Sequence, residues 1–123
     1  MRAIRGATTV ETDRPDAIRE ATREMLLEML ERNGLVAADI ISAIFTVTPD
    51  LKSEFPAIAA RELGWGDIAL LCTTEIPVPR ALARCIRVLM HVDTERGRDA
   101  IRHVYLRGAA SLRPDLMGNR RES

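Results

Sequence analysis

The segment CIRVLMHV, residues 85–92, is the stretch that most clearly indicates a β-sheet. Its apolar and β-branched residues suit a pleated, covered surface. Side chains alternate along a strand, so if Ile86 and Val88 point to one side, Arg87 and His91 point to the other. Arg87 then either lies in solvent or faces an anion, because a buried guanidinium loses several kcal/mol of hydration unless an anion replaces the water.

Similar runs of β-branched and apolar residues predict more strands on both sides of this segment. The expected strands are residues 2–10, 39–48, 68–73, 85–93 and 101–106. Gly6, in the first of them, permits close approach of backbone or ligand. Residues 74–79 contain two prolines, which favour an extended loop after the third strand.

Two amphipathic helices are predicted between these strands. Residues 15–32 place apolar side chains at spacings of three and four, with Asp13 as the expected N-cap and Asn33-Gly34 as the end. Residues 51–63 predict a second, shorter helix that ends at Gly64-Trp65-Gly66. The order of elements indicates an α+β fold, a mixed sheet with helices on one face.

One domain over residues 1–116 and a flexible C-terminal tail over residues 117–123 are expected. A chain of 123 residues with 46% hydrophobic residues can build one core but not two. The sheet face without helices would be exposed in a monomer, which favours a small oligomer.

The charge balance argues against nucleic acid as a partner. Basic and acidic residues both number 18, and aromatic residues make up 3% of the chain, whereas phosphate binding needs a basic surplus and single strands need stacking rings. Lys52 is the only lysine, so the other 17 cations are arginines. Arginine binds carboxylates bidentately, but composition alone favours a general replacement of surface lysine, so most of these arginines need no function.

Cysteine usage and hydropathy favour a cytoplasmic protein without a membrane segment. The chain has two cysteines, no apolar signal region near Met1, and no run approaching the roughly 18 apolar residues of a membrane span. It also lacks Cys-x-x-Cys, clustered histidines and glycine-rich phosphate loops. No metal and no cofactor are therefore expected.

Several polar residues stand at positions where chemistry is commonly found, and each also has a plainer interpretation. Glu75 follows the third strand directly, but it could be an exposed loop acid. Tyr105 and Arg5 could equally be surface residues of their strands. Cys72 is more typical of a small buried side chain than of a nucleophile. Pattern alone predicts a sheet protein that binds an acidic metabolite.

Six blocks, in order along nearly the whole chain, resemble the AroH-class chorismate mutases. They are RGATTVE at 5–11, TPDL at 48–51, FPAIAARELGW at 55–65, CTTE at 72–75, CIRVLMHV at 85–92, and IRHVYL with LRPDL within 101–116. No single block is specific, but the ordered set is.

The resemblance implies a homotrimer whose mixed, ferredoxin-like sheets form a pseudo α/β-barrel, with active sites between subunits. It also implies the Claisen rearrangement of chorismate to prephenate, on the route to phenylalanine and tyrosine. This reaction is unimolecular and pericyclic, so the family uses no metal, cofactor or nucleophile. Chorismate is the small-molecule partner that the resemblance implies.

The resemblance also implies a role for individual residues. Arg87 matches the cation against the ether oxygen of the transition state, and Glu75 the acid that accepts a hydrogen bond from the ring hydroxyl. Arg5 matches the arginine that binds a substrate carboxylate, and Tyr105 the tyrosine that forms a hydrogen bond nearby. The other matched positions are pocket-lining Leu71, Cys72, Thr73 and Thr74, and a neighbouring wall and lid of Phe55, Ala57, Arg61, Leu112 and Arg113. Ile58 departs from the family's pattern, which has lysine there.

Two other classes of function remain open at this point. A trimeric module could bind a carboxylate metabolite without transforming it. A small trimeric hydrolase or deaminase could instead use Cys72 or Glu75 chemically.

Overall fold

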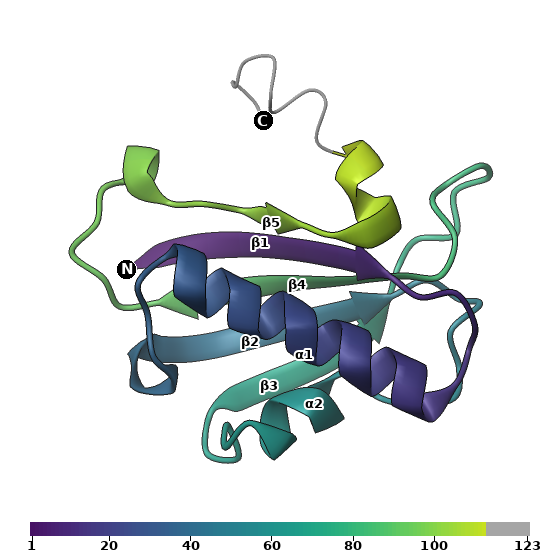
Figure 1. Ribbon diagram of the computed structural model, residues 1–123, viewed down its shortest axis with the longest axis horizontal. Helices are drawn as coiled ribbons and strands as arrows, with labels where there is room; N and C mark the ends of the chain where they lie inside the picture. The colour runs from purple at the N-terminus through teal and green to yellow at the C-terminus, as the bar shows by residue number, and fades with distance from the viewer. Residues whose placement is uncertain (113–123) are drawn as a thin grey trace.

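Strand β4 (Cys85–Val92) lies at the centre of a five-stranded sheet in the computed structural model, which describes residues 1–112. The strand order is β3-β2-β4-β1-β5 (Figure 1). Strands β1 (Arg2–Thr9) and β2 (Ile40–Val47) flank β4 and run antiparallel to it. The outer strands β3 (Ala69–Thr74) and β5 (Val104–Tyr105) run parallel to β2 and β1 respectively.

Two α-helices cover one face of this sheet, α1 (Pro15–Arg32) and α2 (Ala57–Glu62) (Figure 1). Three short 3-10 helices lie at Ala37–Asp39, Arg98–Ala100 and Arg107–Leu112. The α+β class, the mixed sheet and the position of the helices are confirmed. The 3-10 helix that begins at Arg107 was not predicted, because it lacks the length that makes a helical pattern recognisable.

The core lies between the helices and the sheet, as the alternation in β4 predicts. Ile86, Val88 and Met90 are buried there, whereas Arg87 and Leu89 point to the face without helices. The main contributors from the other elements are Ile4, Ile18, Met25, Leu26, Met29, Phe45 and Trp65. A methyl group at Gly6 would overlap the sulfur of Met29, so glycine allows α1 to lie directly on β1.

The predicted N-cap of α1 is wrong. Arg14 occupies the N-cap position without a side-chain hydrogen bond. The Asp13 carboxylate instead accepts hydrogen bonds from the backbone N–H groups of Lys52 and Ser53, at 3.0 and 3.1 Å, and from the Ser53 hydroxyl at 2.8 Å. The Ser53 hydroxyl in particular holds the pKa of Asp13 below its usual value. Asp13 therefore stabilises a distant loop rather than its own helix.

The predicted helix at 51–63 is only partly correct, because α2 begins at Ala57. The bonds to Asp13 hold the backbone at Lys52 and Ser53 in an irregular path. Pro56 then takes the N-cap position, where a missing N–H costs nothing. The long-range hydrogen bonds to the Asp13 carboxylate therefore override the helical periodicity at the start of this segment.

The predicted strand at 101–106 is also shorter than expected, since β5 contains only Val104 and Tyr105. The main chain of Arg102 is bound by the Asn33 side chain instead of by a neighbouring strand. Asn33 Oδ1 accepts from the Arg102 N–H at 2.7 Å, and Asn33 Nδ2 donates to the Arg102 carbonyl at 2.9 Å. We call this arrangement the Asn33 clasp.

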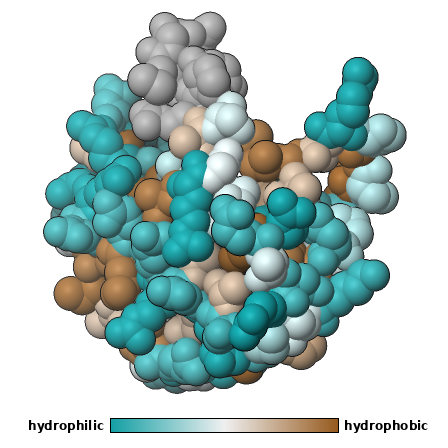
Figure 2. All heavy atoms as spheres, turned by 45° about the vertical axis from the view of Figure 1, so that its right-hand side comes forward, coloured by the Kyte–Doolittle hydropathy of each residue, from teal (hydrophilic) through white to brown (hydrophobic). Residues whose placement is uncertain are grey.

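A loop between β3 and β4 projects from the body of the molecule (Figure 1). Apolar side chains gather beneath its hydrophilic tip (Figure 2), and Ile76 and Val78 in this loop are both largely exposed. The prolines at 77 and 79 account for its lack of regular structure. Within residues 1–112 we find no helix that is long and apolar enough to cross a membrane. The predicted tail at 117–123 lies outside the described residues.

Candidate active site

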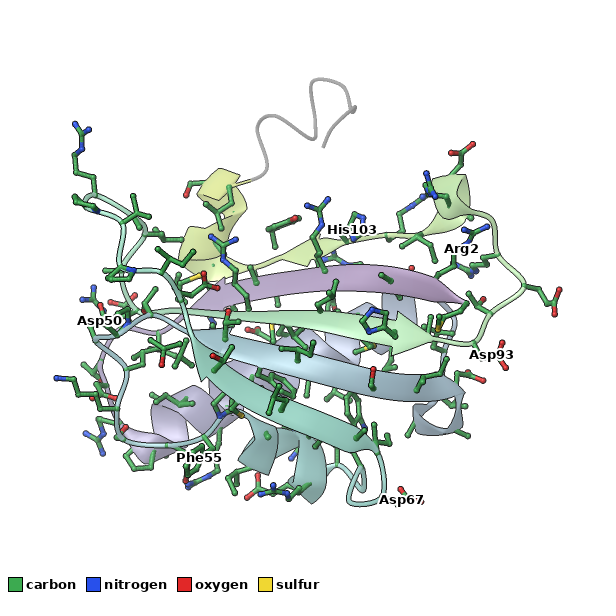
Figure 3. All side chains as sticks on the ribbon, turned by 180° about the vertical axis from the view of Figure 1, so that it is seen from behind. Arg2, Asp50, Phe55, Asp67, Asp93 and His103 are labelled. Atoms are coloured by element: carbon green, nitrogen blue, oxygen red, sulfur yellow. The ribbon has the colours of Figure 1, made fainter. Side chains whose placement is uncertain are left out.

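The sheet face without helices, which is turned toward the viewer in Figure 3, carries the predicted polar residues in one row. The strand registers pair Arg87 with Thr46 on one side and with Ala7 on the other. Beyond Ala7, the parallel pairing of β1 with β5 adds Tyr105. Arg5 lies two residues back along β1, on the same face. The row therefore crosses four strands, which only the assembled sheet can bring together.

Arg87 and Glu75 form an ion pair at the middle of this row. Arg87 Nε lies 3.5 Å from Glu75 Oε2, and the two side chains are 49% and 25% exposed. The backbone N–H of Glu75 donates to the Val47 carbonyl at 2.8 Å, which fixes the residue at the end of β3. The exposure of Arg87 leaves room for a second anion beside the carboxylate.

Thr46 orients this carboxylate, although no local pattern marks it as a functional residue. Its hydroxyl donates to Glu75 Oε2, the same oxygen that faces Arg87. Thr46 stands in a run of apolar residues, so its strand pattern predicted no special role. Only the register with Arg87 reveals it, and that register depends on contacts between distant segments.

A cavity of about 330 Å³ opens over the row and is lined by Arg5, Glu75, Arg87 and Tyr105, among others. The volume is in the range of small-molecule sites, and apolar atoms of Ile44, Val88 and Leu89 form part of its wall. The lining includes two arginines and one glutamate, so the cavity favours an acidic ligand. The four residues singled out from the sequence thus meet in one site.

Other residues implicated by the sequence lie around a second cavity, of about 270 Å³. Its lining includes Phe55, Cys72, Thr73 and Thr74. Phe55 is 65% exposed at the edge of the sheet beside α2, while His103 lies along the opposite edge (Figure 3). Within this chain, therefore, the two sets of residues line different cavities.

The remaining implicated residues are scattered. Leu71 is 60% exposed on the helix-free face, and Arg61 is exposed on α2. Ala57 is buried in the core, and Ile58 beside it is half-buried. Leu112 is half-buried at the end of the last 3-10 helix, and Arg113 lies outside the described residues.

In the described chain the cysteines and the acids form no metal centre, and burial makes Cys85 poorly suited to act as a nucleophile. Both cysteines are free thiols, and burial raises the pKa of Cys85 even though Arg87 partly opposes this. Between residues 1 and 112, no group of three or more His, Cys, Asp or Glu side chains could hold a metal ion. The groups gathered around Arg87 can supply fixed charge and hydrogen bonding.

Known proteins resemble this chain over nearly its whole length. The profile for "Chorismate mutase type I" matches residues 1–116. The chain is 56% identical to chorismate mutase AroH of Thermus thermophilus over 117 residues, which is 94% of this chain and 96% of that protein. It is 44% identical to chorismate mutase AroH of Bacillus subtilis (strain 168) over 117 residues, 94% and 92% of the two chains.

The fold agrees with a solved structure as well. A chorismate mutase from Clostridium thermocellum superposes with a TM-score of 0.89 at 55% identity, covering 90% of this chain and 99% of that one. The family profile extends over every strand of the sheet, and each relative aligns with 94% of the chain. The chain therefore belongs to the type I chorismate mutase family.

Proposed function

We propose that this protein rearranges chorismate to prephenate. In this reaction a carbon–oxygen bond breaks and a carbon–carbon bond forms within one molecule, and no proton is transferred. A catalyst must hold the flexible dianion in its reactive shape and stabilise the charge that develops. The observation that carries the proposal is the Arg87–Glu75 pair, with its atoms 3.5 Å apart, in a cavity that Arg5 and Tyr105 also line.

Arg87 is the cation that we assign to the ether oxygen. Negative charge grows on this oxygen as the carbon–oxygen bond lengthens. Arg87 projects from β4, whose backbone is paired with β1 and β2 on its two sides, so its base is fixed before the reaction begins. A fixed cation stabilises developing charge without reorganisation, which makes such groups large contributors to catalysis.

We assign the other three residues to binding. Arg5 holds a substrate carboxylate, and Tyr105 donates a hydrogen bond beside it. Glu75 accepts from the ring hydroxyl and faces the partly positive ring. The Thr46 hydroxyl supports this role, because it keeps the carboxylate turned toward the cavity.

We also propose a homotrimer in which a second copy completes each site. The exposed apolar side chains of Leu71 and Leu89 on the helix-free face support an assembly that covers them. Phe55 and Cys72 line a different cavity from Arg87 within one chain, which supports their contribution to a neighbour's site. Ala57, Arg61, Leu112 and Arg113 would belong to the same neighbouring wall and lid.

Two broader assignments accompany this function. We propose a cytoplasmic location, which the two free cysteines support. We further propose that residues 1–116 form the catalytic domain and that 117–123 are a tail.

The function is tested with purified protein, chorismate and a chelator. We expect the absorbance of chorismate to disappear and prephenate to form at a rate far above that in buffer. Arg23→Ala is the matched control, because Arg23 is exposed on α1, away from the cavity, and should leave the rate unchanged. Protein that binds chorismate without accelerating its conversion would overturn the proposal.

Replacing Thr46 with valine should lower kcat/KM about tenfold, which corresponds to about 1.4 kcal/mol for a hydrogen bond to a partly exposed charged group. Valine keeps the shape and the β-branching of threonine, so the strand should form as before. Steady-state kinetics, with the midpoint of thermal unfolding measured in parallel, provide the check.

Thr46→Ser is the matched control, since serine retains the donor to Glu75. It should stay close to the parent protein. Equal losses in the valine and serine variants would mean that the hydroxyl does not orient the carboxylate.

A further inference from the structure

His103 lies beside the site, and its imidazole makes a contact that the proposed roles leave unexplained. The backbone N–H of Arg5 donates to His103 Nδ1 at 2.9 Å. The β1–β5 ladder pairs Gly6 with Val104 and Ala7 with Tyr105, and it ends there. At the next position along the ladder, the His103 side chain thus takes the place of a backbone acceptor. The contact ties Arg5 to the strand that carries Tyr105.

This bond restricts the imidazole to one protonation state. A ring nitrogen can accept only when it carries no proton, so His103 must be neutral with its proton on Nε2. Protonation at Nδ1 would place a donor against the Arg5 N–H, and the bond would be lost. The contact between β1 and residue 103 is therefore conditional on a neutral ring.

The surroundings favour the neutral ring. His103 borders a cavity of about 360 Å³. The charged residues that line it are all cationic: Arg2 and Arg5 from β1, Arg98 from the 3-10 helix Arg98–Ala100, and Met1 with its amino group. Leu89 is the contribution of β4, and among the described residues no acid lines this cavity. Burial and, to a lesser extent, Arg5 hold the pKa of His103 below its usual 6.5.

We propose that His103 is a positioning residue, which holds the Arg5 backbone so that the Arg5 guanidinium reaches a substrate carboxylate, and which releases it on protonation. The inference rests on the carboxylate-binding role proposed for Arg5. Arg5 lines both the 330 Å³ cavity and the cavity beside His103, so a shift of its backbone changes the site directly. The effect should fall on KM, because Arg5 binds substrate in the ground state as well as the transition state.

Two substitutions distinguish the role of His103 as a hydrogen-bond acceptor from the effect of its protonation. Asparagine places Oδ1 near the position of His103 Nδ1 but does not titrate, so His103→Asn should keep KM within about twofold of the parent at pH 8. Leucine has no acceptor, and His103→Leu should raise KM roughly threefold to tenfold at every pH, the range for loss of one hydrogen bond. In both variants kcat should change less than KM.

The pH profile supplies the second readout. Because the pKa of His103 is lowered, its neutral form persists down to moderately acidic pH, and the acceptor is lost only as pH falls through that pKa. The KM of the parent should therefore rise at acidic pH relative to that of His103→Asn. Groups common to both proteins, including the substrate, cancel in this ratio. An acidic rise that persists unchanged in His103→Asn, or equal KM values for the two variants at pH 8, would overturn the proposal.

Nuclear magnetic resonance distinguishes failure of this inference from failure of the proposed function. The backbone amide of Arg5 in protein labelled with ¹⁵N-arginine, assigned by comparison with Arg5→Lys, should shift with the same midpoint as the His103 ring protons. In His103→Asn it should not shift over this pH range. If the protein has no mutase activity, the proposed function fails. The pH-dependent shift of the Arg5 amide would still show whether protonation of His103 affects the Arg5 backbone. If the Arg5 amide did not shift while His103 titrates, His103 protonation would not be coupled to the Arg5 backbone.

Discussion

Replacing Arg87 with citrulline is expected to lower kcat roughly 10²–10³-fold while changing KM much less. Citrulline is nearly isosteric with arginine but neutral, so it removes the charge and keeps most of the shape. The loss corresponds to about 2.7–4 kcal/mol of transition-state stabilisation, typical of one fixed donor aimed at a developing oxyanion. The prediction depends on the position of Arg87, which projects from the central strand into the cavity.

The sequence itself offers a route to this variant. Cys85 lies two residues before Arg87, so a synthetic peptide over 85–123 can be ligated to a thioester of residues 1–84. Ligation of the same peptide with arginine at position 87 provides the matched control. A citrulline protein that turns over at nearly the parent rate would show that the charge of Arg87 is not catalytic.

Replacing Asn33 with leucine is expected to destabilise the folded protein by about 3 kcal/mol, and to lower its unfolding midpoint by roughly 10 °C. Asn33 is only 1% exposed. Its amide donates to the Met29 carbonyl at 2.8 Å and forms both bonds of the clasp with Arg102. Leucine has a similar volume, so the loss measures the unsatisfied backbone groups more than a cavity.

Thr22→Val is the matched control for this experiment. Thr22 is also buried on α1, but its hydroxyl donates within the helix, to the Ile18 carbonyl at 2.7 Å. Loss of this hydrogen bond should lower the free energy of unfolding by about 1 kcal/mol. Both variants must be melted at the same protein concentration, since an oligomer's midpoint depends on it. If Asn33→Leu cost no more than Thr22→Val, the clasp would not be a major tertiary constraint.

The elements that could be predicted from sequence are those whose pattern is local. The alternation in residues 85–92 predicted which side chains of β4 are buried, and the apolar spacing over 15–32 predicted α1. Both follow from the periodicity of a single element. The gathering of Arg5, Glu75, Arg87 and Tyr105 was expected only from the family resemblance.

The errors arose where one side chain binds a distant backbone. Asp13 was expected to cap its own helix but binds Lys52 and Ser53, and Asn33 takes the place of a strand partner for Arg102. Such bonds leave no periodic signal, because their partners lie 39 to 69 residues apart in the chain. Thr46 and His103 carry no local signal for the same reason, since their importance depends on strand register.

The central place of β4 in the sheet has a consequence for how the folded protein opens. The amides of a strand paired on both sides become accessible to solvent only in the rarest openings of a domain, so their hydrogens exchange slowly. Arg87 shares that backbone, so its anchor lies in the part of the sheet that is paired on both sides. The anchor of Arg87 should consequently stay in place during fluctuations at the loops, and the amide hydrogen of Arg87 should exchange only with cooperative unfolding.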